Sequence, residues 1–305
     1  MNEQRPLWLI ATPIVFLVLW SAGFAVAKLG LQHAPPITLL ALRYVAVLAI
    51  LLPIAALIRP PMPKTARAWA DVAVVGFLIQ VVYFGLCYLA FKSGTSAGAV
   101  AIVVCLQPIL VALIAPRFVG ESTGVRGWIG LALGLAGAAM VILSHGSIAA
   151  EGAFGVICAA GGLLGITGGT LWEKRFGVTH HPVTTNLIQY AVGAAFTVPL
   201  AFVTERVQID WSLQFVGVMA YLVLGNSLLA ITLLLAMIRA GQVSRVSALF
   251  YLVPPLSALF AWPLLGEVMP LWGWAGMILA AGGVALVSRK GKNVVNKKDQ
   301  PVEIT

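Results

Sequence analysis

Long apolar segments recur along the whole chain, and they constrain its fold more than any other feature. Each is about 20 residues long, which is what an α-helix needs to cross the hydrocarbon core of a membrane. Ten such segments can be placed, at residues 7–29, 36–57, 69–91, 97–118, 125–144, 152–173, 183–203, 211–236, 242–264 and 270–288. Because backbone polar groups in lipid must be satisfied within a segment, we expect an all-α membrane protein with ten transmembrane helices.

The composition indicates a lipid environment and excludes an ordinary soluble core. Of the 305 residues, 60% are hydrophobic and 10% are charged, outside the averages for soluble domains. The net charge is +9, but the basic residues lie at segment ends and in the tail. We therefore expect lipid headgroups, and not nucleic acid, as their partners. The first apolar segment is too long for a signal peptide and lacks a cleavage pattern, so it is expected to be a helix.

The distribution of basic residues predicts the orientation of the chain. If the N-terminus is cytoplasmic, 15 of the 19 Lys and Arg residues fall in cytoplasmic loops or in the tail. Only Lys92 and Arg206 fall in outer loops, while Lys28 and Arg43 lie within helices. Because basic residues accumulate on the cytoplasmic side of membrane proteins, we expect both termini to be cytoplasmic.

The two halves of the sequence repeat each other at a constant offset of 146 residues. GAVAIVVCLQPILVALIAPRFVGE, which ends at Glu121, matches VSALFYLVPPLSALFAWPLLGE, which ends at Glu267. The same offset pairs Tyr44 with Tyr190, Pro108 with Pro254, Gly130 with Gly276 and Gly137 with Gly283. Each half holds five predicted helices, an odd number, so the second half should cross the membrane in the opposite sense. We expect inverted repeats at residues 1–145 and 146–291, followed by a basic cytoplasmic tail at 292–305.

These segments resemble the EamA-type members of the drug/metabolite transporter superfamily. The resemblance covers residues 7–288 and rests on QPILVALIAPRFVGE and VPPLSALFAWPLLGE, the Gly-Trp pairs and glycine-rich helices that follow them, and LLALRY. It implies a carrier in the inner (plasma) membrane that exports amino acids or other metabolites, with most similarity to exporters of aromatic and neutral amino acids. Inverted halves would open a midplane site alternately to the two sides of the membrane.

Two amides occupy equivalent positions near the middle of the third and eighth predicted helices. Gln80 and Asn226 are 146 residues apart. A neutral amide is costly in hydrocarbon unless it has a partner, so both should face the interior of the bundle. Together with Tyr83 they are predicted to line a solute pathway. Hydrogen bonding that only holds the helices together is the alternative.

The first, second and sixth predicted helices supply further candidates for substrate binding. Trp20, Ser21, Phe24 and Thr170 offer the aromatic walls and hydroxyls that suit an amino acid, with interfacial anchoring or lipid contact as the alternative. Arg43 lies inside the second predicted helix. It is a candidate partner for a substrate carboxylate. The alternative is that its side chain extends toward the outer interface.

Prolines interrupt the fourth and ninth predicted helices and remove backbone donors there. The residues concerned are Gln107 and Pro108 in the fourth helix, and Tyr251, Pro254 and Pro255 in the ninth. Gln107 and Tyr251 are predicted to bind substrate beside the freed carbonyls, and the prolines to mark a gating kink. A kink that only shapes packing is the alternative.

The acidic residues bear on energy coupling. All ten Asp and Glu residues lie in termini, loops or helix ends. Since proton-coupled carriers often use an intramembrane carboxylate, this pattern favours facilitated diffusion, with a proton-coupled exporter of drugs or other metabolites as the alternative. Glu121 and Glu267 each precede a helix and are predicted to cap its N-terminal dipole.

The sequence lacks the motif that binds nucleotide phosphates and the motif of zinc proteases. No GxxxxGK[ST] or HExxH pattern occurs, and all four His residues fall in predicted loops. An intramembrane enzyme is therefore the most remote alternative. The three cysteines lack metal-ligand spacing, and no cofactor or metal is expected. The expected partners are a small-molecule substrate and the bilayer, and the oligomeric state stays open, a monomer included.

Overall fold

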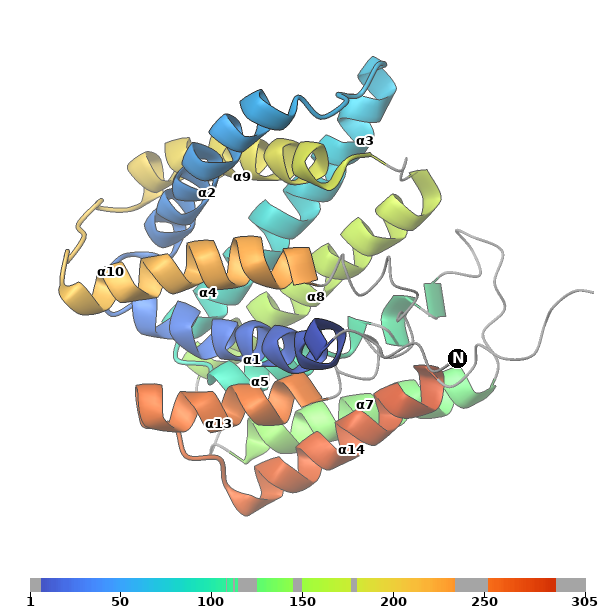
Figure 1. Cartoon of the computed structure of the whole chain (residues 1–305). Coiled ribbons are helices and arrows are strands. Elements are labelled where there is room, and N and C mark those ends of the chain that lie inside the picture. Colours follow the sequence, from blue (N-terminus) through green and yellow to red (C-terminus); the bar gives the residue numbers. More distant parts are fainter. Residues whose placement is uncertain are drawn as a thin grey trace, which may run out of the picture.

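The computed structural model describes residues 7–107, 109–111, 113–114, 125–144, 150–176, 180–233 and 252–288. Its regular elements within these ranges are helices (Figure 1). They are α1 (Leu7–Gly30), α2 (Pro36–Ile58), α3 (Ala66–Gly76), η1 (Phe77–Tyr83), α4 (Phe84–Lys92), α5 (Ala97–Val104), α7 (Val125–Leu143), α8 (Ala150–Phe176), α9 (Pro182–Thr204), α10 (Leu213–Ala220), η2 (Tyr221–Ala230), α13 (Val253–Leu265) and α14 (Leu271–Ser288).

Six helical segments of the described chain are long and apolar enough to span a membrane. They are Thr12–Gly30, Pro36–Ile58, Ala66–Lys92, Ala153–Glu173, Pro182–Thr204 and Leu213–Leu233. Shorter apolar helices lie at α5, α7, α13 and α14. The predicted all-α membrane architecture is therefore confirmed.

Local chemistry explains where several helices begin. The side chains of Thr65, Ser96 and Ser212 precede α3, α5 and α10, and each accepts a hydrogen bond from the backbone N–H three residues later. These bonds satisfy N–H groups that have no partner inside the helix. Pro36 and Pro182 begin α2 and α9, at positions where a missing N–H costs nothing.

Two π-helical segments interrupt the long spans. Segment η1 joins α3 to α4, and η2 continues α10. Shifting η1 by 146 residues gives 223–229, which falls inside η2, so the two segments occupy equivalent positions in the sequence repeat. They hold Gln80 and Asn226 respectively. Such widened turns are rare and often occur at functional sites, and nothing in the sequence predicted them.

The prolines of the ninth predicted helix lie at a helix start. Described α13 begins at Val253, so Pro254 and Pro255 occupy its first turn, where no intrahelical hydrogen bond is lost. In the fourth predicted helix, α5 ends at Val104, and a turn at residues 105–106 precedes further helical residues from Gln107. Pro108 lies outside the described residues.

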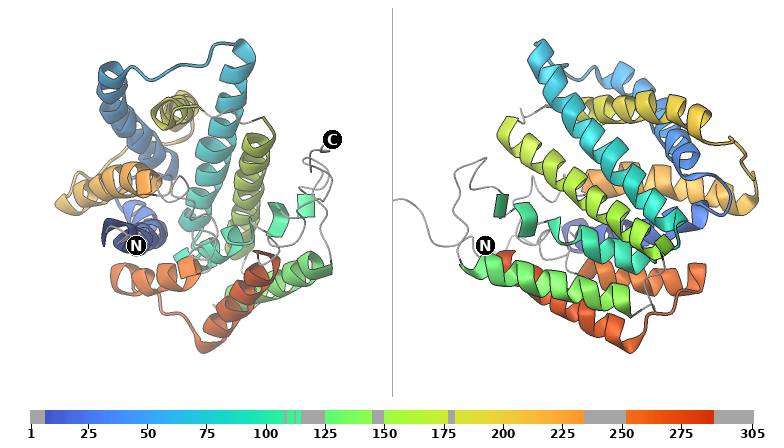
Figure 2. Two further views of the ribbon diagram at one scale, coloured as in Figure 1. Left: turned by 45° about the vertical axis from the view of Figure 1, so that its right-hand side comes forward. Right: turned by 180° about the vertical axis from the view of Figure 1, so that it is seen from behind.

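Helices distant in the sequence pack side by side. Contacts join α2 to α9, α7 to α14, α1 to α13 and η2, and α8 to α3, η1, α4 and α5. Figure 2 shows the first two of these pairs at opposite sides of the molecule. The start of α1 and the end of α14 lie at the same end of the bundle, as Figure 1 shows.

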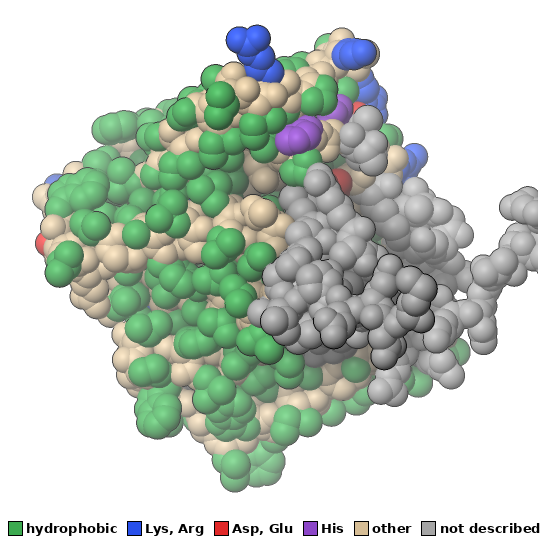
Figure 3. Space-filling view, in the orientation of Figure 1, with side chains coloured by type: hydrophobic (Ala, Val, Ile, Leu, Met, Phe, Trp, Pro, Cys, Tyr) green, Lys and Arg blue, Asp and Glu red, His purple; other side chains and the backbone are tan. Residues whose placement is uncertain are grey.

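The outer surface of the bundle is apolar. In Figure 3, hydrophobic side chains cover most of the described part of the visible face, and Lys and Arg side chains gather near its top and upper right. Leu57, Leu213 and Leu271 expose 85%, 89% and 84% of their surface. Such exposure would be costly in water, and in a membrane these residues contact lipid chains.

Candidate functional site

A cavity lies between α1, α2, the joined η1 and α4, and η2. Its empty volume is ≈ 400 Å³, which includes space open to the surroundings. Its lining consists of Trp20, Gly23, Phe24, Ala27, Arg43, Tyr83, Phe84, Cys87, Tyr88, Phe91 and Asn226. The walls are thus mainly aromatic, and the Arg43 guanidinium is the charged group among them.

The Arg43 side chain is buried, with 2% of its surface exposed. It therefore does not extend to the outer interface, which was the alternative left by the sequence. Its Nε donates to Ser227 Oγ at 2.9 Å, its Nη1 to Tyr88 OH at 3.3 Å and its Nη2 to Asn226 Oδ1 at 2.8 Å. The guanidinium carbon also lies 4.8 Å from the centre of the Phe84 ring, at cation–π distance. All of these partners are neutral.

Contacts between η2 and α1 orient the amide that holds Arg43. Asn226 Nδ2 donates to the carbonyl of Leu19 at 3.3 Å, which turns Oδ1 toward the guanidinium. Gly23 makes room for this amide, because a Cβ at residue 23 would lie 2.5 Å from Asn226 Nδ2. Within the described residues, Arg43 is a buried cation without an acidic partner and creates a strong positive potential, so the cavity favours an anionic group beside it.

Five residues predicted to bind substrate line this one cavity. They are Trp20, Phe24, Arg43, Tyr83 and Asn226. They come from four different elements, and no sequence spacing shows that they meet. Their role in binding stays a prediction, but their convergence around a buried charge gives it a definite geometry.

Gln80 and Ser21 lie away from the lining. The Gln80 backbone carbonyl accepts a hydrogen bond from Tyr44 OH at 2.6 Å, and its side chain packs where α9 has Gly193. The Ser21 carbonyl accepts from Ser257 Oγ at 2.8 Å. Gln80 Oε1 and Ser21 Oγ are both buried without a partner in the described part of the chain.

A separate polar contact joins two other predicted residues. Gln107 Nε2 donates to Thr170 Oγ1 at 2.7 Å, and the Thr170 hydroxyl donates to the carbonyl of Ile166. This contact links the turn after α5 to α8, apart from the residues that line the cavity. Tyr251 lies outside the described residues.

Sequence reasoning missed four residues that complete the site. Phe84 and Tyr88 lie one turn apart on α4, with Phe91 three residues further on, so their spacing is that of a helix face. The helical spacing of these aromatic residues was visible in the sequence. For Ser227, the only indication in the sequence was its position next to Asn226.

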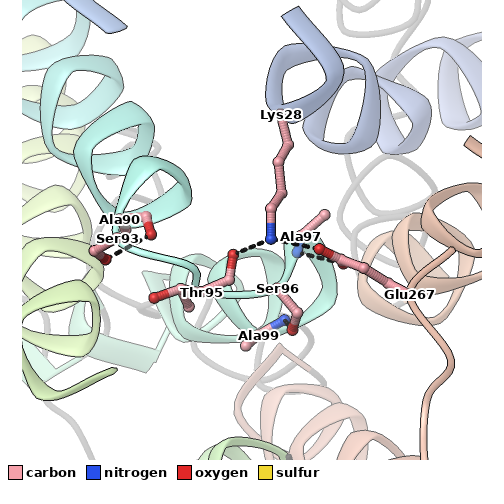
Figure 4. Close-up of polar contacts among 8 residues, drawn as sticks. All are labelled: Lys28, Ala90, Ser93, Thr95, Ser96, Ala97, Ala99 and Glu267. Carbon is pink, nitrogen blue, oxygen red and sulfur yellow. Dashed lines mark hydrogen bonds and ion pairs between the residues drawn. The ribbon is translucent and has the colours of Figure 1, made fainter. Parts of the chain in front are cut away.

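A polar cluster joins the end of α1, the start of α5 and a residue just beyond the end of α13 (Figure 4). Lys28 Nζ, from the end of α1, forms an ion pair with Glu267 Oε1 and donates to the carbonyl of Thr95 at 2.7 Å. Glu267 Oε2 accepts from the backbone N–H of Ala97 at 3.0 Å. Glu267 therefore caps α5. The prediction that it caps the following helix, α14, is wrong, because packing brings the start of α5 closer. Glu121 lies outside the described residues.

Metal ligation is not apparent in the part of the chain that the structure describes. No group of three or more His, Cys, Asp or Glu side chains there has an arrangement that could hold a metal ion. The arrangement at Arg43 suits the reversible binding of an organic anion, and it offers no nucleophile paired with a base.

Comparison with known proteins identifies the family. The EamA-like transporter family matches residues 7–143 and again residues 153–289. The chain belongs to the EamA-like transporter family. It is therefore a multi-pass membrane protein of a family of transporters, as its apolar helices also indicate.

Named relatives of this EamA-like chain span nearly its whole length. An uncharacterized transporter, YvbV, from Bacillus subtilis is 27% identical over 95% of each chain. An uncharacterized inner membrane transporter, YedA, from Escherichia coli K12 is 24% identical over 94% of this chain and 93% of its own. A probable amino-acid metabolite efflux pump from Salmonella typhimurium is 24% identical over 89% of this chain and 91% of its own.

A solved structure has the same fold. It is described only as the crystal structure of a protein, with a TM-score of 0.64 and 20% sequence identity. The similarity covers 95% of this chain and 100% of the other. At this identity the likeness concerns the fold alone.

Proposed function

We propose that this EamA-like chain exports small metabolites, above all aromatic or neutral amino acids, from the cytoplasm by alternating access and facilitated diffusion. One observation carries the proposal, namely the aromatic cavity with Arg43 buried in its wall among neutral partners. A guanidinium binds a carboxylate through two parallel hydrogen bonds, and aromatic rings suit an apolar side chain. The name of the Salmonella relative, an amino-acid metabolite efflux pump, points to the same substrate class.

Ten helices arranged as two inverted halves are part of the proposal, and contacts between α7 and α14 support it. A Cβ on Gly137 would collide with the carbonyl of Gly276, and a Cβ on Gly283 would lie 2.6 Å from the carbonyl of Gly130. The repeat offset of 146 residues converts the first pair into the second. Tyr44 and Tyr190, which the offset also pairs, contact each other with ring centres 5.6 Å apart. A twofold axis in the membrane plane would produce both relations.

The charges support the proposed orientation and the uncoupled mechanism. Both ends of the described chain lie at one end of the bundle, as two cytoplasmic termini require. The acidic side chains with a described environment lie near helix ends, for example Glu205, which accepts hydrogen bonds from the first backbone N–H groups of α2. Facilitated diffusion needs no carboxylate in the middle of the membrane.

Efflux from liposomes tests the proposal. The purified chain is reconstituted, and efflux of labelled phenylalanine and leucine is followed with and without a pH gradient. We expect efflux above that of protein-free vesicles and independent of the gradient. Arg43→Gln should lower it at least about tenfold, since a hydrogen bond to a charged group contributes about 1.5–3 kcal/mol.

Lys92→Gln is the matched control, because it removes one positive charge from an exposed position at the end of α4. Its efflux should equal that of the unmodified chain. If no amino acid leaves faster than from empty vesicles, the proposed substrate class is wrong. Efflux that follows the pH gradient would instead indicate proton coupling.

A further inference from the structure

The cavity holds a positive charge and, among its described lining residues, no negative one. A zwitterionic amino acid brings both a carboxylate and an ammonium group. The carboxylate finds Arg43, whereas the ammonium finds no acidic side chain in this lining. Two of the described carboxylates, Glu205 at the start of α2 and Glu267 on Lys28, have partners elsewhere.

The hydrogen-bonding capacity of Arg43 fits one carboxylate. A guanidinium carries five N–H donors, and three of them donate to Ser227, Tyr88 and Asn226. One N–H on each terminal nitrogen has no acceptor in the described part of the chain. Two donors on neighbouring nitrogens match the two oxygens of a carboxylate.

Three neutral polar groups of the site are already engaged by the guanidinium. The oxygens of Ser227, Tyr88 and Asn226 all accept from Arg43, and the face of Phe84 lies against it. An ammonium near these groups would also meet the charge of Arg43, and like charges repel strongly where water is excluded. The remaining walls are mainly aromatic, with Trp20, Phe24 and Tyr83 among them.

We infer that the site recognises the carboxylate and the apolar body of its substrate and does not require an amino group. The substrate class then extends from aromatic amino acids to amine-free aromatic monocarboxylates. This inference rests on the proposed function, since it concerns the same cavity. It differs in naming the carboxylate as the one charged group that binding needs.

Three probes of nearly equal size separate the two charges. Phenylalanine carries both groups, 3-phenylpropionate only the carboxylate, and phenylalaninamide only the ammonium. Their binding to the purified full chain is measured by titration calorimetry, which avoids the diffusion of the acid through lipid. We expect 3-phenylpropionate to bind within about tenfold of phenylalanine, and phenylalaninamide about a hundredfold more weakly, the factor expected for the loss of hydrogen bonds to a charged group.

Variants of Arg43 and Lys92 test whether the binding of 3-phenylpropionate takes place at this site. Arg43→Gln should weaken 3-phenylpropionate about tenfold to a hundredfold, while Lys92→Gln leaves it unchanged. Arg43→Lys keeps the charge but not the paired donors. The affinity of this variant for 3-phenylpropionate should therefore fall between those of Arg43→Gln and Lys92→Gln. Should either Arg43 variant fail to fold, the ranking of the three probes on the unmodified chain still decides.

The outcomes separate the two proposals. If phenylalaninamide binds as well as phenylalanine, or if 3-phenylpropionate does not bind, the inference is refuted, even where vesicles export phenylalanine. If 3-phenylpropionate binds through Arg43 but vesicles export no amino acid, the proposed amino acid export fails and the inference stands. Binding of none of the three probes refutes the inference.

Discussion

The close packing of α14 against α7 predicts a large difference between two neighbouring glycines. Gly283 of α14 faces α7, where a Cβ would lie 2.6 Å from the carbonyl oxygen of Gly130 and 2.8 Å from the backbone nitrogen of Gly134. The preceding residue, Gly282, is exposed, and a Cβ there would meet nothing within 4 Å. Changing each glycine to alanine therefore adds the same methyl group in two opposite environments.

The magnitude follows from the spacing. A carbon atom rarely approaches a carbonyl oxygen closer than about 3.3 Å, so Gly283→Ala would force α7 and α14 apart by about 0.7 Å. Overpacking of this kind costs about 1–3 kcal/mol. Alanine also stabilises a helix by about 1 kcal/mol relative to glycine, and this gain is common to both variants. The difference between the two variants thus isolates the packing cost of about 1–3 kcal/mol.

Thermal unfolding in detergent measures this difference. A maleimide dye that fluoresces on reaction reports the exposure of Cys87 and Cys158, which are buried in the folded chain. Gly283→Ala should melt about 2–12 °C below Gly282→Ala, given roughly 2–4 °C per kcal/mol in chains of this order of size. Equal melting temperatures would refute the reasoning. If Gly283→Ala lowers the melting temperature but Gly137→Ala does not, the twofold relation of the interface is refuted instead.

The remaining predictions concern polar groups inside the bundle. Glu267→Gln should lower the free energy of unfolding by about 1–3 kcal/mol, because it breaks the ion pair with Lys28. Adding Lys28→Met to it should cost less than the sum of the single changes, and additive losses measured by thermal unfolding would contradict the coupling. Ser21→Ala should raise stability by about 1 kcal/mol, since its buried hydroxyl has no partner in the described part, and a lower melting temperature would show that it has one. Asn226→Ala should reduce efflux from liposomes far more than Gln80→Ala, because Asn226 holds Arg43 and Gln80 faces α9, so equal effects would reject this difference.

The architecture was predictable from the sequence because helix formation in a membrane depends on local properties. The predicted helices at 36–57, 183–203 and 270–288 correspond to Pro36–Ile58, Pro182–Thr204 and Leu271–Ser288. Hydropathy gives the length of each span, and prolines, glycines and charges give its ends. The repeat offset is likewise a property of the sequence.

The composition of the site required packing between distant segments. From the sequence, the Arg43 side chain could point into the bundle or toward the outer interface. In the structure it points inward, because Ser227 and Asn226, more than 180 residues away, accept hydrogen bonds from it there. Gln80 and Asn226 are equivalent in the sequence, yet Gln80 faces α9 while Asn226 lines the cavity. Glu267 caps α5 because tertiary packing, and not chain order, places the start of that helix beside it. A helix pattern shows which residues share a face, but the neighbour that this face meets depends on how all the helices assemble.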